Sequence, residues 1–464
     1  MGKWQLGRAI GRKSVSTFTA AAALGLAFFA ATPKADAQGL SFIRDTEVEK
    51  LLKDYSQPIF RVAGLGGQNI SIRIIKNDNF NAFVLDGQHV FIHTGTIMQS
   101  DTPNEVIGVL AHETGHIVGG HLAQLRDRIA RDQTKSLLIK VLGIGLMVAG
   151  GGSGTSGLGT GVLVGGDQML MRSLLADRRA QESSADQAGL RFLTATHQSG
   201  KGMLETFERF AQQEYISASG ETQDPWARSH PMSADRLARL RKSVEQSPYY
   251  NKKDPPELQL RHDLVRAKLN GYLLAPSVVF NRYRKEGNTL PARYARAIAT
   301  FFRSGLDAAL PAVNALIAEQ PRNPYFHELK SDFLMRSGRP NEAIGPLKVA
   351  MKLAGNPPLM AVSLAQALDS RNDAASVREE IELARRSLVQ DKNPQAYRLL
   401  ASGYAKQNLL AKADLAIAEA HFLEGNVKMA KIFAKRAQRG LKNGSPDALR
   451  AGDIVSYNQP KGAL

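Results

Sequence analysis

The sequence predicts a mostly helical α+β protein, in which a domain with a small antiparallel sheet is followed by an α-superhelical array of repeats. Short runs of alternating apolar residues between positions 70 and 92 predict the strands, and apolar residues at helical spacing dominate the rest of the 464-residue chain. An Asn-Pro pair also recurs at Asn323, Asn356 and Asn393, a spacing typical of stacked helix pairs. The length allows two or three domains.

The first 37 residues have the composition of a secretory signal peptide. A positively charged start is followed by a short apolar run from Phe18 to Ala31 and by an A-x-A cleavage site that ends at Ala37. The apolar run is shorter than a membrane span requires, so a membrane anchor is the weaker alternative. We therefore expect an exported protein that is cut after Ala37, with the periplasm favoured over release to the medium.

The charge and the cysteine count narrow the choice of partners and ligands. The chain has a formal net charge of +17, and the residues after position 37 carry about +13 of it. Such a charge favours anionic lipid headgroups or acidic partners, although a merely soluble basic surface explains it equally well. Nucleic acid is not an expected partner of an exported protein. The chain has no cysteine, so a zinc site would use only nitrogen and oxygen ligands.

A first domain is expected at 38–250. It should begin with a polar helix from 46 to 55. Three runs with strand character follow, at 70–75, 82–85 and 89–92. The last two flank Asp86-Gly87, which favours a tight hairpin turn. An edge strand of this sheet could bind an extended peptide by strand addition, and a purely structural hairpin is an equally good interpretation.

The sequence HETGH at 112–116 is the most informative part of the chain. A capping-box pattern with proline, TPNE at 102–105, predicts that a helix begins just before it. On a helix, His112 and His116 lie one turn apart on the same face, where two neutral imidazoles can bind one Zn²⁺. Glu113 could then accept a proton from the attacking water. A chance match on a structural helix is the alternative.

A catalytic zinc site needs a third protein ligand. The pattern HExxHxxGxxH would require a histidine where this chain has Leu122, and His121 is one residue out of register, so it should point away from the ligand face. The candidate is therefore Glu182 on a later helix. From the residues alone, a surface carboxylate paired with Arg178 or Arg179 explains Glu182 at least as well.

Asp186 lies one turn after Glu182 on the same predicted helix face. It could accept a hydrogen bond from the distal ring N–H of His112 or His116 and so fix the tautomer of that ligand. Close packing of this helix against the first is favoured by three small residues: Ala185, Ala188 and Gly189.

Residues 137–171 form an unusual insertion in this domain. Two apolar arms flank a tract from 150 to 161 that consists mainly of Gly, Ser and Thr. Each arm is too short for a membrane span, and Lys140 interrupts the first. A lid over the site, or a hairpin that touches the membrane surface, is one interpretation, and a disordered insertion is the other. Further helices are expected at 173–196, 201–215 and 233–245.

A polar, proline-bearing stretch at 246–256 predicts the domain boundary, with a connector at 251–289. Tetratricopeptide-like repeats are expected at 290–445, because Gly338 falls at a helix–helix turn and Ala343 in the second helix of a unit of about 34 residues. Such arrays bind proteins on a concave face. The remaining residues, 446–464, are expected to form a tail.

HExxH followed by ExxxD on a later helix resembles the HtpX and CAAX-protease-like gluzincin family of zinc metallopeptidases. A third element of that family is also present, since His230-Pro231 is followed by Arg236. The resemblance extends from about Val48 to Glu245 and includes the general layout of the tail. Integral-membrane relatives carry true spans around the catalytic helices, whereas this chain has only the short arms of the insertion.

The resemblance implies a role for each matching residue. The ligands of one zinc ion would be His112, His116 and Glu182. Glu113 would be the general base and then the general acid, and Asp186 would orient a ligand histidine. His230 would lie on a loop at the cleft, where it either stabilises the oxyanion or caps the zinc in a latent state. Arg236 would help to hold that region.

These features predict an exported zinc endopeptidase whose repeats recruit substrates or a partner complex. The resemblance implies quality control of unfolded or misassembled envelope proteins, with the outer-membrane barrel-assembly machinery as the partner. A non-catalytic or latent periplasmic chaperone or scaffold that acts through its repeats is the alternative of another class. A peptidoglycan amidase or hydrolase is a third interpretation, because those enzymes are also exported zinc enzymes.

Overall fold

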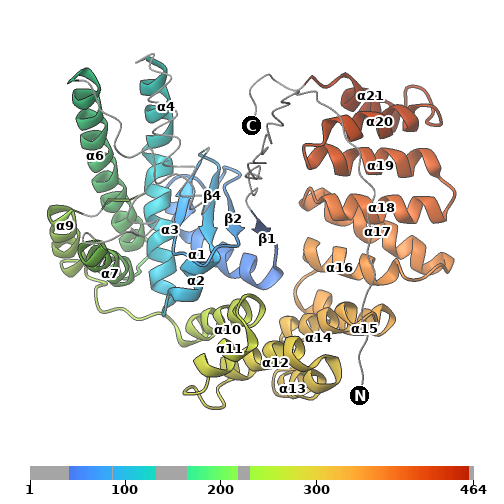
Figure 1. The fold of residues 1–464 in the computed structure, drawn as a ribbon, viewed down its shortest axis with the longest axis horizontal. Helices are drawn as coiled ribbons and strands as arrows, with labels where there is room; N and C mark the ends of the chain where they lie inside the picture. Colours follow the sequence, from blue (N-terminus) through green and yellow to red (C-terminus); the bar gives the residue numbers. More distant parts are fainter. Residues whose placement is uncertain (1–40, 86, 132–164, 218–229, 232, 459–464) are drawn as a thin grey trace, which may run out of the picture. The chain divides into compact units, whose positions relative to one another are not determined.

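The computed structural model describes residues 41–458, except for 86, 132–164, 218–229 and 232 (Figure 1). The predicted signal peptide lies outside the described residues, and so does most of the predicted insertion. Within the described ranges, every helix is too short or too polar to span a bilayer.

Helix α1 (Thr46–Val62) is about two turns longer than the helix predicted at 46–55. Asp45 caps its start, since the carboxylate accepts a hydrogen bond from the Val48 amide at 2.9 Å. The apolar residues recur every three or four positions, which gives the helix one buried face. The largest buried side chains on that face are Leu51, Leu52, Tyr55 and Ile59.

Four strands form one sheet in the order β1-β2-β4-β3: β1 (Phe42–Ile43), β2 (Ser71–Ile75), β3 (Ala82–Val84) and β4 (His89–His93). The predicted hairpin is present, because β3 and β4 pair antiparallel with Val84 opposite Val90. β2 and β4 are parallel, however, with Ile74 opposite Ile92. The sheet is therefore mixed, which corrects the expected antiparallel sheet. Alternating apolar residues reveal strands but not their order, and here β4 enters between β2 and the edge strand β3.

Several helices complete this part of the chain: α2 (Thr94–Gln99), α3 (Pro103–Val118), α4 (His121–Arg131), α6 (Gly165–Ala195), α7 (Lys201–Ser217) and α9 (Ala234–Glu245). The predicted capping box starts α3, where Thr102 and Glu105 each accept a hydrogen bond from the backbone amide of the other. α3 packs against α1, α6, α7 and β3, and almost all of its residues are buried (Figure 1). Its apolar run thus makes α3 the central helix of the domain.

Helix α10 (Pro256–Leu273) connects the first domain to the repeats. Val265 and Leu269 lie in the hydrophobic core that also contains residues of α1 and α3, whereas Leu264 and Ala267 lie in the core of the repeats. A single helix therefore buries side chains in both cores. The predicted connector consists of α10 followed by the short helix α11 (Pro276–Arg282).

Helix pairs form the C-terminal part: α12 (Leu290–Ser304) with α13 (Leu306–Glu319), α14 (Pro324–Arg336) with α15 (Pro340–Leu353), α16 (Pro358–Leu368) with α17 (Ala374–Gln390), α18 (Pro394–Lys406) with α19 (Leu410–Leu423), and α20 (Val427–Gln438) with α21 (Pro446–Ser456). The first helices of these pairs start 33 to 36 residues apart, which matches the predicted period. Much of the segment expected as a tail is α21, whose Ala451 and Ile454 are buried against α19 and α20.

A buried charge cluster connects α1 to the second repeat. The side chain of Lys268 on α10 is only 7% exposed. Its ammonium nitrogen lies close to three carboxylates: Asp45 Oδ2 at 2.7 Å, Glu47 Oε2 at 3.3 Å and Glu328 Oε2 at 3.5 Å. The Tyr294 hydroxyl donates a further hydrogen bond to Glu47 at 3.0 Å. Because burial disfavours the ionised form, the pKa of Glu328 is raised to about 7, and the pKa of Glu47 is raised as well.

This cluster is expected to contribute less to the stability of the folded protein as the pH rises from about 5 to 8. The pKa of Glu328 is about 7 in the folded protein against an ordinary value of 4.5. The stability that its proton contributes is therefore complete below pH 4.5 and is lost as the pH rises through 7. A Glu328→Gln variant stays neutral, so its melting temperature should depend less on pH than that of the wild type.

The matched control is Glu342→Gln. The hydrogen bond from Arg339 lowers the pKa of that exposed carboxyl below 4.5, so it does not titrate in this window. Melting temperatures of the wild type and both variants at pH 5, 6, 7 and 8 test whether Glu328 causes the pH dependence. Identical pH profiles for the wild type and Glu328→Gln would contradict the assignment.

Candidate metal centre

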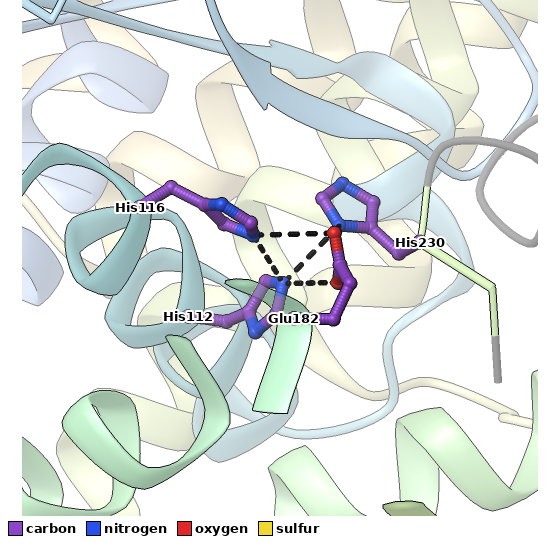
Figure 2. Close-up of side chains that lie close together, drawn as sticks. All are labelled: His112, His116, Glu182 and His230. Atoms are coloured by element: carbon purple, nitrogen blue, oxygen red, sulfur yellow. Dashed lines mark hydrogen bonds and ion pairs between the residues drawn. The ribbon is translucent and has the colours of Figure 1, made fainter. Parts of the chain in front are cut away.

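His112 and His116 lie on consecutive turns of α3, and their rings point toward Glu182 of α6 (Figure 2). Their Nε2 atoms are 3.1 Å apart. The His112 side chain is fully buried, and that of His116 is 15% exposed. The helix thus brings the two imidazoles together as the four-residue spacing predicted.

Glu182 brings a carboxylate from α6 to the same point. Its Oε2 lies 3.4 Å from His112 Nε2, and its Oε1 lies 3.5 Å from His116 Nε2. The side chain is 3% exposed, so Glu182 is not the surface carboxylate of the alternative interpretation. Arg236 Nη1, 3.1 Å from Oε2, is a further partner.

Small residues allow α6 to approach α3 this closely. A Cβ atom on Gly115 would lie 2.6 Å from the backbone oxygen of Ala185. A Cβ atom on Gly189 would lie 3.1 Å from the backbone nitrogen of His112. The close packing predicted for Ala185 and Gly189 is therefore present, and it sets the distance from Glu182 to the histidines.

Asp186 and Arg236 hold the residues of the cluster in place. Asp186 Oδ1 lies 2.9 Å from His112 Nδ1, a contact that holds a ring proton on Nδ1 and leaves Nε2, which faces Glu182, as the atom available to a metal. Arg236 of α9 donates to both oxygens of Asp186, at 2.5 and 2.8 Å. Although burial opposes ionisation, the hydrogen bond from Arg236 lowers the pKa of Asp186.

His230 adds a third imidazole from the segment that precedes α9. Its Nδ1 lies 3.2 Å from His112 Nε2 and 3.0 Å from Glu182 Oε2, whereas its Nε2 faces the Ala82 carbonyl of β3 at 3.4 Å. Arg236 donates to the backbone oxygen of His230 at 3.4 Å and so holds this segment. Four residues therefore have candidate ligand atoms within 4.8 Å of one another: His112, His116, Glu182 and His230 (Figure 2).

Glu113 lies beside this cluster. Its side chain is 1% exposed, and its Oε1 is 3.4 Å from His230 Nε2. Burial raises the pKa of the Glu113 carboxyl to about 8, and a cation nearby would favour the ionised form. A carboxylate at the edge of the cluster is suited to proton transfer rather than to ligation.

The charges of the cluster favour a cation. Burial opposes ionisation of Glu182, yet the neighbouring histidines lower its pKa well below 4.5. Burial lowers the pKa of His116 to about 4 and also lowers that of His230. Burial opposes protonation of His112 too, but hydrogen bonds to Asp186 and Glu182 raise its pKa to about 9. The carboxylates thus attract positive charge to a point where imidazole nitrogens converge.

Two contacts at the site were not predicted. His121 lies outside the ligand group, as its register indicated, but its Nδ1 is 2.9 Å from His116 Nδ1. The Phe207 ring of α7 packs edge-on against His112, with centroids 5.4 Å apart, and Arg236 lies 5.3 Å over the same ring. The sequence offers no signal for Phe207, because an apolar residue that supports a site looks like any core residue.

The donor set fits a divalent metal of the zinc type, which accepts imidazole nitrogen and carboxylate oxygen in tetrahedral sites. The contact between Asp186 and His112 supports this fit, since it holds a ring proton on Nδ1 and leaves Nε2 as the atom that a metal would bind. HExxH on one helix, a glutamate from a second helix and a buried carboxylate beside them define the site of a metallopeptidase.

Residues 43–244 match the model of peptidase family M48. This match spans the candidate site and supports the family of metalloproteases expected from the motifs. Among curated proteins, the beta-barrel assembly-enhancing protease of Yersinia pestis is 26% identical over 397 residues, covering 81% of this chain and 76% of that protein. The protein of the same name from Escherichia coli K12 is 27% identical over 390 residues, covering 80% and 75%.

The metalloprotease LoiP of Escherichia coli K12 is 27% identical over 177 residues, which cover 38% of this chain and 64% of that protein. Among solved structures, yeast Tom70 aligns with 77% of this chain and 80% of its own, at 10% identity and a TM-score of 0.29. The family match at 43–244 includes the site, whereas the TM-score of the Tom70 alignment is too low to support a conclusion.

Proposed function

We propose that this protein is an exported zinc endopeptidase that hydrolyses peptide bonds of unfolded or misassembled envelope proteins. The observation that carries the proposal is the convergence of His112, His116 and Glu182, from two helices, with Glu113 beside them. The identity of 26% to the beta-barrel assembly-enhancing protease of Yersinia pestis, over 81% of the chain, supports the envelope context.

The residues divide the chemistry between them. His112, His116 and Glu182 hold one zinc ion, which when bound polarises the scissile carbonyl and lowers the pKa of water. Glu113 accepts the proton of the attacking water and passes it to the leaving amine. Asp186 keeps His112 in the ligating tautomer. The edge strand β3 beside the site offers backbone groups to an extended peptide, which favours the strand-addition interpretation.

The repeats are proposed to bind substrates or the outer-membrane barrel-assembly machinery. Stacked helix pairs of about 34 residues present a surface that commonly binds protein segments. The shared name of the relatives from Yersinia pestis and Escherichia coli refers to β-barrel assembly. The periplasm is the proposed compartment, because residues 1–37 have the composition of a cleavable signal. A peripheral contact of the insertion at 137–171 with the membrane surface is part of the same proposal.

Purified protein without residues 1–37 tests this function. We expect about one zinc ion per chain and cleavage of an unfolded test protein, with cleavage lost on chelation and restored by zinc. Absence of zinc, or zinc without cleavage in both the wild type and His230→Ala, would favour a scaffold or chaperone that acts through the repeats. Release of soluble muropeptides from purified sacculi would favour a peptidoglycan hydrolase instead.

His230→Ala is expected to increase proteolysis. The Nδ1 atom of His230 lies among the metal-ligand atoms, so His230 is proposed to cap the zinc and to hold the enzyme in a latent state. Removing a cap worth about 1 kcal/mol or more would raise kcat/KM at least ~5-fold. If His230 stabilises the oxyanion instead, kcat should fall by ~10²–10³-fold.

The control for this variant is His197→Asn. His197 is exposed and has a φ angle of 57°, a backbone conformation that asparagine tolerates well. Its replacement should leave the rate of cleavage unchanged. Rates measured at equal zinc occupancy separate the two roles of His230, because a fall in activity would exclude the capping role.

A further inference from the structure

We infer that His121 is a positioning residue, which orients the ligand His116 by accepting a hydrogen bond from its second ring nitrogen. The inference rests on the proposed metal site and concerns a residue outside the ligand set. His121 Nδ1 lies 2.9 Å from His116 Nδ1, and the two rings are nearly perpendicular, at 82°. The whole residue is 7% exposed, so water does not readily replace either partner.

The tautomers of both rings follow from this contact. If His116 uses Nε2 for the metal, its ring proton must lie on Nδ1, which makes this nitrogen the donor. His121 must then present an unprotonated Nδ1 as the acceptor and carry its own proton on Nε2. The two ligand histidines are thus held in the same manner, His112 by the carboxylate of Asp186 and His116 by a neutral imidazole.

The chain reaches this arrangement through two glycines. Helix α3 ends at Val118 with Gly119 as its C-cap, and Gly120 has a φ angle of 61°, the left-handed conformation that turns the chain into α4. His121, the first residue of α4, folds back over that turn. A Cβ atom on Gly119 would lie 2.3 Å from His121 Nε2. The φ angle of Gly119 is −68°, which any residue can adopt, so space for the imidazole is what requires glycine there.

This close approach shows that the turn is built around the His121 ring. The position of α4 is also fixed independently, because the Gln124 side chain donates to the Gly119 carbonyl at 2.8 Å. Arg126 of the same helix donates to the Leu85 carbonyl, also at 2.8 Å. His121 is therefore presented to His116 from a helix that has its own contacts.

The test measures metal affinity rather than proteolysis. Metal-stripped protein without residues 1–37 competes with a chromophoric chelator for Zn²⁺, and the Co²⁺ form is examined by its visible spectrum. His121→Leu, which removes the acceptor, should weaken Zn²⁺ binding by about 10- to 100-fold and alter the Co²⁺ bands. His121→Asn, whose Oδ1 can take the place of Nδ1, should restore most of the affinity. The melting temperature of each metal-free variant serves as the control for folding.

A second pair of variants keeps the inference testable if His121→Leu folds poorly. Gly119→Ala should displace the imidazole and weaken Zn²⁺ binding in the wild-type background. In a His121→Ala background the ring is gone, so Gly119→Ala should have no further effect. Equal weakening by Gly119→Ala in both backgrounds would show that the glycine acts on the backbone alone and would overturn the inference.

The outcomes separate this inference from the proposed function. A wild-type protein that binds no metal contradicts the proposed function itself. Tight binding by the wild type and equally tight binding by His121→Leu overturns only the role of His121. The inference is also overturned if His121→Asn is as weak as His121→Leu, because a contact that depends on an acceptor should respond to the acceptor that asparagine provides.

Discussion

Glu113→Gln is expected to lower the rate of peptide hydrolysis by ~10²–10⁴-fold, the contribution typical of a general acid–base group. The Glu113 carboxyl lies at the edge of the cluster and is not among the grouped ligand atoms, so its replacement by an isosteric amide should leave the metal content unchanged. Glutamine cannot accept the proton of the attacking water. The loss should therefore appear in kcat rather than in substrate binding.

The measurement pairs zinc content with the cleavage rate of an unfolded test protein. Glu205→Gln is the matched control, since Glu205 lies on α7 with an exposed side chain that pairs only loosely with Lys201, at 3.7 Å. This variant should cleave at the wild-type rate. Substantial proteolysis by zinc-loaded Glu113→Gln would exclude Glu113 as the base, and loss of zinc from it would place Glu113 among the ligands.

Glu182→Gln is expected to weaken zinc binding by more than ~100-fold, beyond the usual effect of losing a partner of a ligand. Glu182 is the carboxylate that faces both histidines, at 3.4 and 3.5 Å, and glutamine removes its negative charge while keeping its shape. Arg236 would also lose a buried ionic partner, so we expect the metal-free variant to be less stable than the wild type.

Asp186→Asn provides the graded comparison for Glu182→Gln. Asp186 contacts His112 Nδ1 and not the converging nitrogens, so its replacement should weaken zinc binding by about 10- to 100-fold. Competition with a chelator measures both variants on one scale. If Asp186→Asn binds zinc more weakly than Glu182→Gln, the two carboxylates have been assigned the wrong roles.

The helices show why some features can be predicted from sequence. Helix α3 could be placed because its capping box, its proline and its apolar run all lie within a few residues of one another. The repeats could be placed because Asn323 and Asn393 each precede a proline that starts a helix, and both asparagine side chains cap that helix. Helix α21 lies in the segment expected as a tail. It buries few large side chains, chiefly Ile454, so its sequence has only a weak apolar pattern.

The sheet and the site show what such local patterns omit. The alternation of apolar and polar residues predicted the positions of β2, β3 and β4. The parallel pairing of β2 with β4, however, depends on how the chain returns to the sheet. Glu182 resembled a surface carboxylate on its own helix, and only the resemblance to a family selected it. The contact of His121 with His116 follows from a turn at Gly119 and Gly120, which helical periodicity does not describe.

The sequence by itself determined the kinds of ligand, their spacing on α3, the repeat period and the resemblance to a family of zinc metallopeptidases. These properties depend on interactions within a turn or two of a helix, or on motifs that can be read directly. The tertiary structure alone decided that His230 reaches His112 across 118 positions of the chain, and that Asp186 faces one ligand and His121 the other. Such contacts depend on how closely whole helices pack, and here glycines at 115 and 189 allow α3 and α6 to approach.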